Sequence, residues 1–173
     1  MVRQEGVGEL ESTSSQPRKG ILLTNHRSKL MEDELKKLKY LYMFPRSVEV
    51  CALEAHEIVG WVVPGWVALY EIAFKDGMRL SIPKLVRDVL DHYEIAPSQL
   101  MPNAWRILMA LECLSMQHGI ACEIGEVLVS YYLKEHNTDN GRCHLIMRVG
   151  RVPIITCLGT NNCNWKDRYF FVK

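Results

Sequence analysis

Apolar residues recur at helical spacing in several stretches of the chain. These stretches cover residues 28–44, 66–77, 81–95, 103–118 and 123–136. In the fourth stretch apolar side chains surround nearly the whole circumference, which is typical of a helix buried on all sides. The pattern therefore predicts four or five helices packed around a central buried helix at about 103–118.

Polar residues and glycines mark where these helices are expected to begin and end. Asn103 can cap the central helix, and Gly119 stands just beyond its last turn. Ser28 and Ser81 are the corresponding caps of the first and third stretches. Within the central helix we expect Trp105 to anchor the core and Arg106 to lie on the narrow polar face that remains.

Alternating or aromatic patterns predict a few strands. Residues 47–53 alternate over a short length, and residues 143–149 and 152–158 flank a Gly-Arg turn as the arms of a β-hairpin would. The chain stops on the apolar run YFFVK (169–173), which has no local partner. The expected fold class is thus α+β and mainly α-helical, with a small C-terminal β-hairpin. It forms one domain over residues 28–173, after a polar lead-in at 1–27 that we expect to be disordered.

Bulk composition narrows the class of protein. The 173 residues are 48% apolar and 24% charged, which is ordinary for a globular domain. The most apolar stretch, 58–70, is too short to span a bilayer and contains Pro64-Gly65. No apolar leader segment follows Met1, so we interpret the six cysteines as free thiols in an intracellular protein, nuclear or cytoplasmic.

Charge is distributed unevenly along the chain. Residues 51–140 carry six basic and twelve acidic side chains, whereas residues 141–173 carry six basic and one acidic. A basic end could attract nucleic acid. The alternative is that the tail folds back and the two signs neutralise each other.

The basic tail holds the candidate nucleic-acid contacts. They are Arg142, Arg148, Arg151, Lys166 and Arg168, and near the end of the chain they interleave with Trp165, Tyr169, Phe170 and Phe171. Cations for phosphates and aromatic rings for bases are the groups that single-stranded nucleic acid requires. A strand that packs its aromatic side chains on the domain gives the same pattern.

No residue pattern indicates a catalytic, cofactor-binding or metal-binding site. Cys113, His118 and Cys122 come nearest to a metal set, but their spacing points them in different directions. Nucleophile elbows and phosphate-binding glycine loops are absent from the sequence. An acidic triad for metal-dependent DNA cleavage could be drawn from eight carboxylates, which we interpret as solvated helix faces: Glu71, Asp76, Asp88, Asp91, Glu94, Glu112, Glu123 and Glu126.

Two blocks of sequence carry a resemblance to a known family. Residues 63–114 contain YEIAF, GMRL, APSQL and PNAWR in that order, and residues 165–172 read WKDRYFFV. Together they resemble the plant gypsy-type transposon (transposase) domain family, over about residues 28–173. The chain departs from the family pattern at RLSIP, where proline comes two positions later than usual.

The resemblance implies origin in a plant long-terminal-repeat retroelement. It brings no catalytic residue, and the family's usual downstream tail is missing here, as in a truncated remnant. We expect a non-catalytic structural or interaction module, gag-like in role, that binds a protein partner or itself. The alternative is a nucleic-acid-binding module, and a transposase or integrase enzyme is least favoured. No cofactor, membrane or small-molecule substrate is expected.

Overall fold

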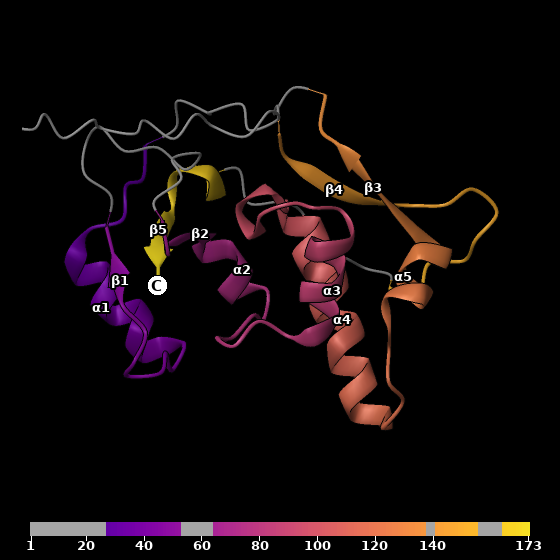
Figure 1. The fold of residues 1–173 in the computed structure, drawn as a ribbon, viewed down its shortest axis with the longest axis horizontal. Coiled ribbons are helices and arrows are strands. Elements are labelled where there is room, and N and C mark those ends of the chain that lie inside the picture. Colours follow the sequence, from indigo (N-terminus) through magenta and orange to yellow (C-terminus); the bar gives the residue numbers. More distant parts are fainter. Residues whose placement is uncertain (1–26, 53–63, 138–140, 156–163) are drawn as a thin grey trace, which may run out of the picture.

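The computed structural model describes residues 27–52, 64–137, 141–155 and 164–173. Across these ranges helices and short strands are interspersed, and the strands form two separate small sheets (Figure 1). The elements are α1 (Glu32–Leu41), β1 (Val50–Cys51), β2 (Val67–Tyr70), α2 (Glu71–Lys75), α3 (Lys84–His92), η1 (Pro97–Gln99), α4 (Pro102–His118), α5 (Ile124–Ser130), β3 (Tyr131–Glu135), β4 (Cys143–Met147), η2 (Trp165–Asp167) and β5 (Tyr169–Val172).

The last strand of the chain lies in the middle of the first sheet. β5 pairs antiparallel with β2, from Val67 opposite Val172 to Tyr70 opposite Tyr169, and with β1 on its other side. All four residues of β5 are buried. The terminal apolar run therefore has a partner on each edge, both of them far away in sequence (Figure 1).

The second sheet is a hairpin of β3 and β4. Five residue pairs are in register, from Tyr131 opposite Met147 to Glu135 opposite Cys143. The expected pairing of 143–149 with 152–158 is wrong, because β4 takes β3 as its partner. Residues 152–155 form no strand, and 156–158 lie outside the described residues.

Helix α4 supplies much of the core through its first half. Trp105 is only 1% exposed, which confirms it as a core anchor, and it lies in one cluster with Phe74, Leu108 and Phe170. From Cys113 onward the helix is largely exposed, so the expectation of a helix buried all round is wrong for its second half. Gly119 ends the helix at a positive φ of 64°, as expected.

The predicted helix caps have other roles. Met101 is the N-cap of α4 and Pro102 its first residue, because a proline loses nothing at that position; Asn103 instead donates through Nδ2 to the Leu145 carbonyl at 3.2 Å. Ser28 donates to the Tyr169 carbonyl at 2.6 Å, four residues before α1 begins. α3 begins only after Pro83, so Ser81 is not its cap.

The predicted fold class is wrong in its composition and in its C-terminal element. Helices make up 43% of the described residues and strands 17%, so these residues are not mainly helical. The C-terminal element is the central strand of a sheet, where a hairpin was expected. Two predicted helices are also part strand, at 67–70 and 131–135. The predicted lead-in lies almost wholly outside the described residues, which begin at 27.

Four cysteines are described, and Cys113, Cys122 and Cys143 are free thiols. Cys143 is buried, Cys51 and Cys122 are partly buried, and Cys113 is exposed. Burial, followed by the nearby Glu135 charge, raises the pKa of the Cys143 thiol, which keeps it protonated and unreactive. The remaining two cysteines lie outside the described residues.

Candidate functional site

Glu71 is a buried carboxylate at the junction of β2 and α2. It is 5% exposed, and its backbone N–H donates to the Arg168 carbonyl at 2.9 Å. Strand pairing of β2 with β5 fixes this position, because the pair Tyr70–Tyr169 comes immediately before it. A buried carboxylate is costly unless cations or hydrogen-bond donors compensate its charge.

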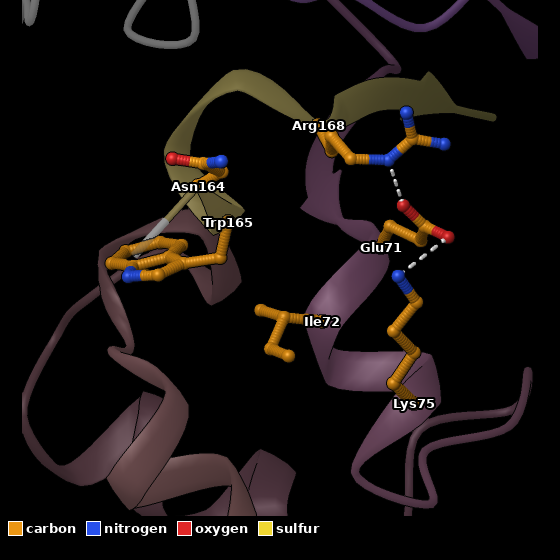
Figure 2. A pocket seen from close by; sticks show the side chains of 6 residues that line it. All are labelled: Glu71, Ile72, Lys75, Asn164, Trp165 and Arg168. Atoms are coloured by element: carbon orange, nitrogen blue, oxygen red, sulfur yellow. Dashed lines mark hydrogen bonds and ion pairs between the residues drawn. The ribbon is translucent and has the colours of Figure 1, made fainter. Parts of the chain in front are cut away.

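Two cations hold the Glu71 carboxylate (Figure 2). Arg168 donates from Nε to Oε2, and Lys75 Nζ lies 3.0 Å from Oε1. Arg168 also binds Glu34 of α1, with Nη2 at 3.0 Å from Oε1. The hydrogen bond to Glu71 is the main reason that the pKa of Arg168 is raised. One guanidinium thus joins α1, α2 and the start of β5.

A pocket of about 250 Å³ opens beside this ion pair. Its lining residues are Glu71, Ile72, Lys75, Asn164, Trp165 and Arg168. Trp165 and Ile72 form one side, and the charged groups form the other (Figure 2).

Arg142 lies on the far side of Trp165 in a second interior contact. Its side chain is 3% exposed, and Nη2 donates to the Tyr70 hydroxyl at 2.6 Å. The guanidinium lies 5.0 Å from the Trp165 ring centroid and 5.5 Å from that of Tyr70. Cation–π contacts and a charged hydrogen bond therefore stabilise a buried cation.

The five predicted nucleic-acid contacts fall into two groups. Arg142, Lys166 and Arg168 lie around Trp165, where Arg142 and Arg168 are bound by side chains of the domain itself. Arg148 and Arg151 lie at the far end of β4, where both are exposed. There Arg148 covers the Tyr132 ring at 5.7 Å and donates to the Leu128 carbonyl.

Two of the eight carboxylates are not solvated. Glu71 is buried as described, and Asp76 accepts a hydrogen bond from Arg106 Nε at 2.9 Å with only 10% of its side chain exposed. The expectation of solvated helix faces is wrong at these two positions. Burial raises the pKa of Asp76, and the Arg106 contact offsets only part of this rise. Arg106 consequently lies at a buried contact between α2 and α4.

The sequence alone did not reveal Glu71 and Glu34 as members of the ion-pair network, or Tyr70 as the partner of Arg142. Their partners lie 72 to 134 positions away, beyond the reach of any local pattern. The charge distribution offered one signal, because an acidic middle and a basic tail can neutralise each other. The ion pair of Arg168 with Glu71 does so.

An apolar groove of about 250 Å³ lies at the end of α4. It is lined by Leu111, Leu114, Ser115, His118, Ile120, Ala121, Cys122, Glu126 and Ile154. Ile120, just after α4, is 71% exposed, and Met116 near the end of α4 is 77% exposed. Val129 on α5, and Val149 and Val152 before Ile154, are exposed as well. Apolar exposure on this scale is typical of an interaction surface.

No group of three or more His, Cys, Asp or Glu side chains in the described ranges converges as a metal site would require. No helix in those ranges is both long and apolar enough to cross a membrane.

Comparison with known proteins identifies one segment. Residues 67–134 match the family model described as "Putative gypsy type transposon". The match runs from β2 to the end of β3 and so includes Glu71, the whole of α4 and most of the apolar groove. No curated protein and no solved structure matches the chain.

Proposed function

From the match of residues 67–134 to the model of the gypsy-type transposon family, we infer that this chain is transposon-derived and is a non-catalytic module that acts by binding a second copy of itself. Within that origin we assign it a gag-like role in a plant long-terminal-repeat retroelement. The observation that carries the proposal is the apolar groove at the end of α4. Its exposed side chains are costly in water unless another surface covers them.

The two segments that form and border the groove have the extent that an interface needs. They are residues 111–129 and 147–155. A subunit of a standard interface contributes roughly 20–30 residues and about 800 Å². These segments number 28 residues, which is within that range, and they lie on the side of the molecule away from α1 (Figure 1).

The groove also carries an imidazole and a carboxylate, which can hydrogen-bond to each other. His118 and Glu126 both line it, on α4 and α5. In a twofold contact, a residue of the first copy that contacts a given residue of the second copy has its own equivalent in the second copy making the same contact to the first. His118 of each chain would then face Glu126 of the other, so the surface is complementary to itself. This favours a second copy over an unrelated partner.

The buried carboxylates support a structural role. Glu71 and Asp76 are each bound by an arginine, so these side chains join α2 to β5 and α4. A metal-dependent nuclease instead needs carboxylates that converge on an ion.

Substitutions in the groove test the proposal. Ile120→Asp and Leu114→Asp each place a charge on the apolar surface of the groove and should weaken self-association at least about tenfold, since a desolvated charge costs several kcal/mol. Tyr40→Asp, at an 89% exposed position on α1, is the matched control. Light scattering on the intact chain measures the effect. Equal weakening by all three variants would refute the groove as the interface.

Nucleic-acid binding is the second candidate, and exposed Arg148 and Arg151 favour it. Because Arg142 and Arg168 make interior contacts, binding should depend on the exposed pair. Arg148→Ala together with Arg151→Ala should lower affinity for single-stranded RNA or DNA and reduce its salt dependence. Affinity that is independent of salt would eliminate this candidate.

A further inference from the structure

Two histidines lie close together at the end of the β3–β4 hairpin. His144 stands opposite Lys134 in the register, and His136, two residues beyond Lys134, donates its backbone N–H to the Arg142 carbonyl at 2.7 Å. Alternation along the strands places Lys134, His136 and His144 on one face of the hairpin. The two imidazoles are thus diagonal neighbours, with ring centroids 5.6 Å apart and planes at 69°.

This separation is close to that of two imidazoles on one metal ion. With metal–nitrogen distances of about 2.0–2.1 Å and a tetrahedral angle, two coordinated rings have centroids about 5 Å apart. The observed 5.6 Å needs only a small adjustment of the side chains. Rotation about each metal–nitrogen bond leaves the angle between the ring planes free.

His144 has a nitrogen suited to a ligand. Its Nδ1 is buried and has no hydrogen-bond partner in the described part of the chain. A buried polar atom without a partner is unfavourable, and a bound ion would satisfy it.

We propose that His136 and His144 form a two-histidine site for a late divalent transition metal ion, Zn²⁺, Ni²⁺ or Cu²⁺, with water completing the coordination sphere. Imidazole suits these ions, whereas Mg²⁺ and Ca²⁺ prefer oxygen ligands. Strand alternation places Glu135 and Cys143 on the opposite face. With two protein ligands, the affinity should be micromolar or weaker.

Metal titration of the intact chain tests the site. Isothermal titration with Zn²⁺ and Ni²⁺ should show one ion per chain, with the affinity reduced at least about tenfold in both His136→Gln and His144→Gln. His92→Gln is a matched control on α3 and should bind as the original chain does. Circular dichroism of each variant checks that the fold is retained.

A spectroscopic measurement identifies the ligands. Cu²⁺ bound to the intact chain should show electron paramagnetic resonance coupling to imidazole nitrogen that is weakened in each of the two hairpin variants. The proposal is overturned if neither ion binds at about 1 mM. It is equally overturned if binding and spectra are unchanged in His136→Gln and His144→Gln.

Discussion

Arg168 at the start of β5 binds the buried carboxylate of Glu71, 97 residues earlier in the chain. The contact fixes the end of the chain against the β2–α2 junction, where Lys75 binds the second carboxylate oxygen. Because Glu34 of α1 also binds Arg168, the same side chain orders three segments. The network acts in folding the domain and lies apart from the proposed self-association surface at the end of α4.

Removing Arg168 should destabilise the fold. Arg168→Met leaves Glu71 buried with only one cation and should lower the free energy of unfolding by about 3 kcal/mol. Urea denaturation measures the change. The double variant with Glu71→Met should recover part of the loss, since no buried charge then remains. Lys36→Met, which breaks an exposed ion pair with Asp33, is the control and should change stability by less than about 0.5 kcal/mol. Equal effects of Arg168→Met and Lys36→Met would contradict the network's role.

Replacement of side chains by alanine should affect stability differently in the two halves of α4. Trp105→Ala removes a side chain that is 1% exposed and should cost about 3–5 kcal/mol. Met116→Ala on the exposed half should change the stability of the monomer by less than about 0.5 kcal/mol. Thermal unfolding at low protein concentration compares the two. A tolerated Trp105→Ala would show that the core is placed incorrectly.

Replacing each of two glycines by alanine should change the stability of the fold in opposite directions. Gly119 ends α4 at a φ of +64°, so Gly119→Ala should be destabilising by about 1 kcal/mol, although nothing lies within 4 Å of the added carbon. Gly125 lies within α5 in equally open space, and Gly125→Ala should stabilise by roughly 0.5–1 kcal/mol. Chemical denaturation of both variants gives the signs, and two changes of the same sign would not fit the structure.

The contributions of two carboxylates to the free energy of unfolding should depend on pH in opposite directions. Hydrogen bonds from the Met31 backbone and Arg168 lower the pKa of Glu34 in the folded state. Its contribution is therefore full above the unfolded pKa and is lost as pH falls through the folded value. Burial raises the pKa of the Asp76 carboxyl in the folded state. The free energy of unfolding should therefore fall as pH rises from the pKa of this carboxyl in the unfolded state to its pKa in the folded state. Unfolding free energies of Glu34→Gln and Asp76→Asn, compared with the original chain between about pH 3 and 6, should show these opposite slopes.

The sequence predicts features that depend on near neighbours. α3 and the buried half of α4 follow from apolar spacing, and Gly119 follows from the need for a positive φ. Asn103 was predicted as a cap because the residue type suits one, but Pro102 already occupies the first position of the helix. Local propensity alone could not decide between these two starts.

Long-range strand pairing explains the larger errors. Residues 67–70 and 131–135 fit a helical pattern, yet pairing with β5 and β4 makes them strands. No residue near YFFV indicates that this run pairs with residues 50–51 and 67–70. The sequence therefore predicts no partner for it. The Glu71–Arg168 site depends on that pairing and could not be predicted without it.

The mass of the intact chain in solution as a function of concentration tests the central claim most directly. If the groove binds a second copy, light scattering should show a monomer at low micromolar concentration that converts to a dimer as concentration rises. Ile120→Asp should remain a monomer over the same range, and Tyr40→Asp should dimerise as the original chain does. A chain that stays strictly monomeric at the highest soluble concentration would contradict the proposed function.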